Sequence, residues 1–223
     1  MMLPTPDTTG LDIFQVYEPA EDSFFLLDTL EEEIAYLRRR LTSESSILPT
    51  VLELGVGSGV VSTFIQQHVL PNAMFFGTDL NPHACKAALQ TSANNNGTKY
   101  FEVLRTNLWD GIKPHSVDLL LFNPPYVPEE SVPDFEKSEK TNDWLDFALV
   151  GGEDGMEITN QVLDHLEEIL TKDTGVAYIL FCRRNKPLQV VQRMKKNGWT
   201  ADLVGERKAG WELLSIYRFT QPT

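Results

Sequence analysis

The stretch TVLELGVGSG, residues 50–59, joins a short apolar run to a loop that carries a glycine at every second position. Residues 50–54 have the length and composition of a buried strand, and the glycines allow a tight turn at which a ligand can approach the backbone closely. The residues from 58 to 69 then predict a helix. A strand, a glycine-rich turn and a helix in this order indicate the first unit of a parallel α/β sheet.

The rest of the chain repeats this alternation. We expect a sheet covered by helices on both faces, because strands and helices take turns along the chain. The last two strands form a hairpin, which adds an antiparallel strand at one edge. The predicted strands are 73–79, 100–105, 117–122, 175–181, 199–204 and 211–219, and the predicted helices are 20–40, 58–69, one opening at Asn81-Pro82, 154–171 and one opening at Pro187.

The length of 223 residues suits one domain, with residues 1–45 as an N-terminal extension and helix and 46–223 as the core. No run of about 18 apolar residues predicts a membrane span. The first ten residues do not have the pattern of a signal peptide. Two cysteines are too few for a disulfide framework. We therefore expect the cytoplasm, with the nucleus as an additional place.

The chain is acidic, with 32 acids, 19 bases and a net charge of −13. An acidic surface repels phosphates, so the composition argues against nucleic-acid binding. It suits a basic protein partner. The four histidines are scattered without ligand spacing, and we expect no metal.

The glycine loop is not a dinucleotide fingerprint, because Val60 stands where the third glycine would be. No lysine follows for a triphosphate. The loop fits a ligand without a pyrophosphate, with a purely structural turn as the alternative.

Asp79 ends the second strand about 20 residues later, where a carboxylate can hold ribose hydroxyls; the alternative is an acid placed by a helix dipole. Asn107 ends the third strand and is either an adenine contact or an ordinary loop residue.

The fourth strand ends abruptly in Asn123, Pro124, Pro125 and Tyr126. Prolines cannot donate to a sheet, so the strand has to stop there. In a parallel sheet the carboxyl ends of the first, second and fourth strands converge, and they bring Glu53, Asp79 and Asn123 to one place. The alternative is a plain strand terminator with a capping asparagine.

Four motifs in order resemble a known family. ELGVGSG (53–59) with TDLNP (78–82) resembles the class I S-adenosylmethionine-dependent methyltransferases, whose Rossmann-like fold has a seven-stranded sheet. NPPY (123–126) is similar to enzymes that methylate a planar amide or amine nitrogen. YEPAEDS (17–23) and LVGGEDGMEI (149–158) resemble the eukaryotic and archaeal HemK-type methyltransferases. That resemblance implies methylation of the glutamine in the Gly-Gly-Gln tripeptide of class I translation termination factors.

The resemblance also implies a set of site residues. Asn107-Leu108 stands where many relatives carry Asp-Leu, so the orientation of that amide bears on cofactor affinity. Glu18 and Asp22 are neighbouring candidates. The implied cofactor contacts are Glu53 and the backbones of Gly55 and Gly57 for the methionine and ribose region, Asp79 with Leu80 for the ribose, Asn107 and Leu108 for adenine, Tyr17 and Ser23 for closing the pocket, and Asn123.

The NPPY motif suggests how a poor nucleophile is activated. An amide nitrogen has its lone pair delocalised, so two acceptors on its hydrogens would localise and aim that pair. Asn123 supplies a side-chain carbonyl and Pro124 a main-chain carbonyl, while the two prolines fix the backbone. Tyr126 offers a flat face to a planar group. Catalysis of this kind depends mainly on orientation.

Three other functions stay open. An acidic surface would also favour methylation of a lysine in a basic protein such as a histone. The same grip serves adenine N6, although the charge and the absence of a basic insert argue against a nucleic acid. A non-catalytic interaction subunit is the third, and the intact Glu53, Asp79 and Asn123 argue against it.

Two segments suggest protein contacts. Residues 128–155 form a long polar segment after NPPY, and we expect it to flank the substrate, to include Trp144 and to order on binding the termination factor. The resemblance implies a small zinc-binding activator subunit as partner in a heterodimer. We expect that subunit to cover an exposed apolar edge near residues 100–105.

Overall fold

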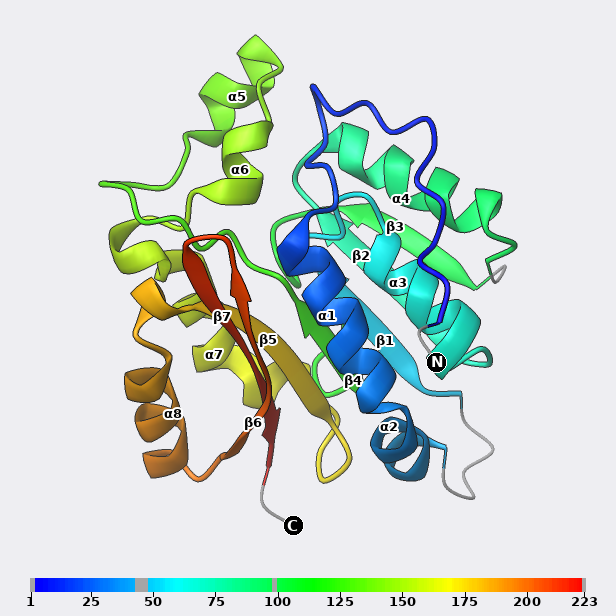
Figure 1. Cartoon of the computed structure of the whole chain (residues 1–223), viewed down its shortest axis with the longest axis vertical. Coiled ribbons are helices and arrows are strands. Elements are labelled where there is room, and N and C mark those ends of the chain that lie inside the picture. Colours follow the sequence, from blue (N-terminus) through cyan, green and yellow to red (C-terminus); the bar gives the residue numbers. More distant parts are fainter. Residues whose placement is uncertain (1–2, 43–47, 98–99, 222–223) are drawn as a thin grey trace.

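The computed structural model describes residues 3–42, 48–97 and 100–221. Seven strands form one sheet in the order β3-β2-β1-β4-β5-β7-β6 (Figure 1). All neighbouring strands pair in parallel except β7, which is antiparallel to both β5 and β6. The predicted α/β class and the C-terminal hairpin are confirmed. The strands are β1 (Thr50–Leu54), β2 (Met74–Asp79), β3 (Phe101–Arg105), β4 (Leu119–Phe122), β5 (Val176–Cys182), β6 (Thr200–Ala209) and β7 (Glu212–Thr220).

Helices cover both faces of this sheet, and the side chains of each central strand point alternately to one face and to the other. In β5, Tyr178 and Leu180 join the apolar cluster under α1 and α3, while Ile179 and Phe181 join the cluster under α7 and α8. Both clusters are almost fully buried, which explains why β4 and β5 are apolar throughout. The helices are α1 (Glu21–Glu32), α2 (Ile34–Leu41), α3 (Val60–Phe64) with a π-helical turn at Ile65–Val69, α4 (Pro82–Asn94), α5 (Phe135–Thr141), α6 (Leu145–Leu149), α7 (Glu157–Ile169) and α8 (Pro187–Lys196).

The N-terminal helix differs from the prediction. The expected single helix over 20–40 is two helices, α1 and α2, separated at Glu33. The Glu33 carboxylate accepts from the Tyr178 hydroxyl at 2.6 Å and from Arg218 at 2.6 Å. These partners lie on β5 and β7, so the interruption is tied to contacts that the apolar periodicity does not contain.

The long segment after NPPY also differs from the prediction. Residues 128–155 are not a plain loop, because they contain α5, α6 and a 3₁₀ turn at Glu153–Gly155. Trp144 is 2% exposed and packs against Phe135 and Phe147. The segment therefore has secondary structure of its own, and its ordering on binding the termination factor stays a prediction.

The topology positions the site. The chain reverses its order between β1 and β4, which is where ligands bind in open parallel sheets. The first helix, α1, and the segment before it lie beside this point (Figure 1). In the described ranges no helix is long and apolar enough to cross a membrane.

Candidate active site

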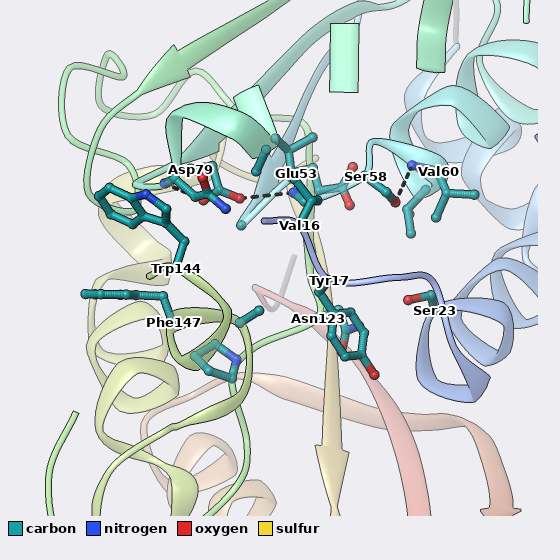
Figure 2. Close-up of a pocket in the computed structure, with 18 of the residues that line it drawn as sticks. Val16, Tyr17, Ser23, Glu53, Ser58, Val60, Asp79, Asn123, Trp144 and Phe147 are labelled. Carbon is teal, nitrogen blue, oxygen red and sulfur yellow. Dashed lines mark hydrogen bonds between the residues drawn. The ribbon is translucent and has the colours of Figure 1, made fainter. Parts of the chain in front are cut away.

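A cavity opens at the carboxyl ends of β1, β2 and β4. Two groups of side chains face each other across it: Tyr17 and Ser23 on one side, Trp144 and Phe147 on the other (Figure 2). A second cavity adjoins it and shares Gly55 and Asp79. Of the predicted residues, the first cavity is lined by Tyr17, Asp22, Ser23, Glu53, Gly55, Gly57, Asp79, Asn123 and Pro125, and the second by Gly55, Asp79, Leu80, Asn107, Leu108 and Pro125.

Three residues of the prediction lie outside both cavities. Glu18 and Pro124 line neither of them. Tyr126 directs its hydroxyl to Glu212 at 3.2 Å, and Glu212 also pairs with Arg184. Tyr126 is thus fixed beside the first cavity by the tip of the β6–β7 hairpin.

The glycine loop leaves its backbone open to a ligand. Gly55 and Gly57 both have positive φ, and a Cβ on Gly55 would meet no atom within 4 Å, so its inner side is free space. Gly59 is required for another reason, since a Cβ there would lie 2.6 Å from the Ala88 Cα of α4. The loop therefore packs tightly against α4 at Gly59 and leaves open space at Gly55.

Glu53 is a buried acid at the end of β1. Its Oε2 accepts from the main-chain N–H of Ser62 at 2.9 Å and from the Ser62 hydroxyl. Burial raises the pKa of Glu53 to about 8, because a charge is poorly solvated there, and the two Ser62 hydrogen bonds oppose this rise. A donor or cation from a ligand would stabilise the ionised form.

Asp79 is held by backbone donors. Its Oδ2 accepts from the Gly57 N–H at 3.0 Å and its Oδ1 from the Asn81 N–H at 2.9 Å. Burial raises the pKa of Asp79 to about 6 despite these bonds. Asn81 also caps α4 through the N–H of His83, as the Asn-Pro pattern predicts. The carboxylate is thus fixed between the glycine loop and the start of α4.

Asn123 has its amide orientation fixed by Asp22. The Asn123 Nδ2 donates to the Asp22 Oδ2 at 3.0 Å, and a carboxylate can only accept. The NH₂ group must therefore face Asp22, which leaves the Asn123 carbonyl oxygen on the other side. That oxygen is buried and has no hydrogen-bond partner within the described structure. Sequence reasoning placed Asp22 nearby but did not assign it this role.

A second set of residues covers the cavity from the 128–155 segment. Trp144 and Phe147 line it, and Arg105 at the end of β3 lies over the Trp144 ring. The Arg105 guanidinium donates to the Leu80 carbonyl at 3.0 Å, pairs with Glu139 at 2.9 Å and stands 5.5 Å from the Trp144 ring centre. Sequence reasoning noticed Trp144 but missed Phe147 and Arg105, since nothing local in the sequence links β3 to this segment.

These residues fit S-adenosylmethionine. Free space along Gly55, a buried acid at Glu53 and a half-buried acid at Asp79 suit a cationic ligand with ribose hydroxyls. Among the described residues no group of three or more histidine, cysteine, aspartate or glutamate side chains could hold a metal ion.

Comparisons with known proteins agree with this geometry. The model of the methyltransferase small domain matches residues 22–135. The eRF1 methyltransferase catalytic subunit mtq2 of Schizosaccharomyces pombe is 38% identical over 97% of this chain and 95% of its own length. The human methyltransferase HEMK2 is 34% identical over 92% of this chain and 90% of its own length.

A solved structure gives the same result. The E. cuniculi Mtq2–Trm112 complex, described as responsible for methylation of the eRF1 termination factor, matches with a TM-score of 0.63 and 25% identity. The match covers 93% of this chain and 99% of the other. The chain belongs to the methyltransferase small-domain family and is a HemK-type, S-adenosylmethionine-dependent methyltransferase.

Proposed function

We propose that this chain transfers a methyl group from S-adenosylmethionine to the glutamine side-chain amide of the Gly-Gly-Gln tripeptide in a class I translation termination factor. The observation that carries the proposal is the buried carbonyl oxygen of Asn123, which is oriented by Asp22 and lacks a partner. The names of the fission yeast relative and of the E. cuniculi complex support the same substrate. We place the reaction in the cytoplasm, where such factors act.

The acceptor amide would be held by two carbonyl oxygens. The Asn123 side chain accepts one N–H of the substrate and the Pro124 main chain accepts the other, which localises the lone pair on nitrogen. Pro124 and Pro125 fix their φ angles, so the acceptors are in place before the substrate arrives. Bound S-adenosylmethionine supplies an electrophilic methyl group. No strong base is required, because the nitrogen becomes acidic once it is methylated, and orientation provides the rate enhancement.

The cofactor contacts follow from the two adjoining cavities. Asp79 is placed to accept from ribose hydroxyls, and Glu53 lies deeper at the end of β1. Asn107 and Leu108 line the second cavity, where adenine would lie. Gly55 lines both cavities and has open space beside it, which suits one ligand that extends across the two.

A small zinc-binding activator subunit would bind at the β3 edge. β3 is the terminal strand of the sheet, and its flanking Tyr100 and its Leu104 are 48% and 39% exposed. A terminal strand with exposed apolar side chains is suited to being covered by another protein. The E. cuniculi complex pairs Mtq2 with a second protein, Trm112.

Lysine is the second candidate acceptor. Segment 128–155 carries nine acids against two lysines, and Asp22 and Glu212 flank Asn123 and Tyr126. Acidic surroundings favour a basic protein segment. A histone tail therefore serves as the comparison substrate for the termination factor.

Replacing Asn123 tests the proposal. Asn123→Ala removes the orphaned acceptor, so we expect methyl transfer to fall by about 100-fold or more while cofactor affinity, measured by calorimetry, stays within about threefold. Transfer to the factor at the wild-type rate would contradict the proposed role of the site.

A further inference from the structure

The backbone that follows Asn123 is held by one buried side chain outside both cavities. Asn185, 2% exposed, lies at the end of β5 in the turn Arg183–Asn185. Its Nδ2 donates to the Tyr126 carbonyl at 3.0 Å and to the Asp154 carbonyl at 2.9 Å, and its Oδ1 accepts from the Cys182 N–H at 2.8 Å. The single amide thus joins the NPPY motif, the 3₁₀ turn after α6 and the end of β5.

The NPPY backbone needs such an external donor. Pro124 and Pro125 have no N–H, so this stretch presents carbonyl groups and few donors of its own. Two glycines of the 128–155 segment lie close to the carbonyl oxygens of this stretch. A Cβ on Gly155 would lie 2.0 Å from the Tyr126 carbonyl oxygen, and one on Gly151 would lie 2.4 Å from the Pro125 carbonyl oxygen.

The contacts fix both ends of the motif. Asp22 holds the Asn123 side chain at the start, and Asn185 holds the Tyr126 carbonyl at the end. Val127 then pairs with Leu149 at 2.8 Å. Between these anchors lies the Pro124 carbonyl, whose direction depends on the peptide planes on either side of it.

We propose that Asn185 is a positioning residue for methyl transfer. By holding the Tyr126 carbonyl it fixes the peptide between Tyr126 and Val127 at the end of the motif, and so keeps the Asn123 and Pro124 oxygens at the spacing that grips a planar NH₂ group. This role rests on the proposed function of the site and goes beyond it. Asn185 lines neither cavity, so it acts through the motif and not through the cofactor.

The competing role is local capping, since Asn185 also accepts from the Cys182 N–H. Asn185→Asp separates the two roles. Aspartate keeps an acceptor for Cys182, but its second oxygen faces the carbonyls of Tyr126 and Asp154 instead of donating to them. A matched control exists at Asn95, whose side chain accepts from the Asp7 N–H and donates to the Asp7 and Thr91 carbonyls far from the site.

The experiment compares Asn185→Asp and Asn95→Asp in the full chain with its activator subunit. We expect Asn185→Asp to lower kcat by about tenfold or more, with cofactor Kd within about threefold of wild type. Hydrogen exchange of the Tyr126 and Val127 amides should rise, while Asn95→Asp leaves both kcat and this exchange unchanged. An unchanged kcat, or a loss explained entirely by cofactor Kd, would overturn the positioning role.

Two further arms keep the result decisive. If Asn185→Asp does not fold, Asn185→Ser, which removes the donors without adding charge, is expected to give the same split between kcat and cofactor Kd. If the wild-type chain does not label the termination factor, the proposed function fails. Hydrogen exchange of the Tyr126 and Val127 amides in Asn185→Asp then still tests whether Asn185 holds the motif. Exchange equal to that of the wild type would reject this role.

Discussion

At the scale of single residues, the direction of one amide carries the chemistry. An asparagine side chain has a donor end and an acceptor end, and only a strict acceptor beside it settles which end faces the substrate. Asp22 is that acceptor, at 3.0 Å from the Asn123 Nδ2. The acid in α1 is therefore as necessary to the proposed grip as the asparagine itself.

Replacing Asp22 by Asn should lower methyl transfer. An amide at position 22 can donate to the Asn123 oxygen and so take up the acceptor that the substrate needs. Hydrogen bonds to charged groups are worth about 1.5–3 kcal/mol, so we expect kcat to fall by about tenfold or more. Steady-state kinetics would show it. Asp28→Asn on the same helix weakens a half-buried pair with Arg207 and should leave kcat unchanged; equal losses in both variants would refute the assignment.

The buried acid Glu53 predicts a pH-dependent stability. Its folded-state pKa of about 8 is above the ordinary 4.5, so between these values the folded chain keeps a proton that the unfolded chain has released. The free energy of unfolding of the cofactor-free wild type should therefore fall as the pH rises through this window. Glu53→Gln has no carboxyl group to ionise at this position, so its stability should not fall in this window. The Tm of this variant minus the Tm of wild type should therefore increase from pH 4.5 to pH 8. A Tm difference that is independent of pH would contradict the burial argument.

At the scale of elements, α5 and α6 close the cavity without belonging to the core. Trp144 is buried, yet it is a member of neither apolar cluster of the described chain. Its neighbours are Phe135, Phe147 and Arg105. Such a locally packed segment can open with a smaller free energy than global unfolding.

Trp144→Ala should therefore weaken cofactor binding more than it weakens the fold. We expect the cofactor Kd to rise by about tenfold, because the wall formed by α6 loses its anchor, with little change in Tm. Calorimetry and thermal unfolding measure the two effects. Trp199 packs against the α7–α8 cluster, so Trp199→Ala should lower Tm and leave the cofactor Kd nearly unchanged. A large Tm loss in Trp144→Ala with an unchanged Kd would disprove the cover role.

The sequence predicted these elements where their determinants are local. The apolar run of residues 50–54 matches β1 residue for residue, and Asn81-Pro82 opens α4 as expected. The interruption at Glu33 was not predictable, because its partners Tyr178 and Arg218 are more than 140 residues away. A continuous apolar periodicity cannot show where a tertiary contact interrupts a helix.

The candidate site divides along the same line. Glu53, Asp79 and Asn123 could be brought together in advance, because the carboxyl ends of parallel strands converge at a reversal of strand order. The orientation of Asn123 by Asp22 depends on a contact between residues 101 positions apart, and it has no local signature. Fold topology thus predicts which residues meet, while the direction in which they face requires the packed structure.

At the scale of the whole molecule, the two ends of the sheet differ in structure: one ends in the terminal strand β3 and the other in the β6–β7 hairpin. Among the described strands β3 is the last at one end of the sheet, and the site lies between it and the β6–β7 hairpin (Figure 1). The net charge of −13 and the acidic 128–155 segment favour a basic protein substrate. Raising the salt concentration should therefore weaken substrate binding more than cofactor binding.

A proline in β3 tests the activator surface. The Phe75 N–H bonds the Tyr100 carbonyl and the Thr106 N–H bonds the Asp79 carbonyl, so by the alternation of a parallel ladder the Val103 N–H faces away from β2. Val103→Pro should abolish co-purification with the activator while cofactor binding by the remaining chain persists. Leu188→Ser, on exposed α8, is the control. An intact complex with Val103→Pro would place the partner elsewhere.

The most direct measurement is labelled-methyl transfer from S-adenosylmethionine to a class I termination factor by this chain with its activator subunit. Two versions of the factor are compared, one with the Gly-Gly-Gln tripeptide and one with its glutamine replaced by alanine. The account predicts label on the first, none on the second, and none on the first with Asn123→Ala. Label on both versions, or on a histone tail alone with cofactor binding intact, would contradict it.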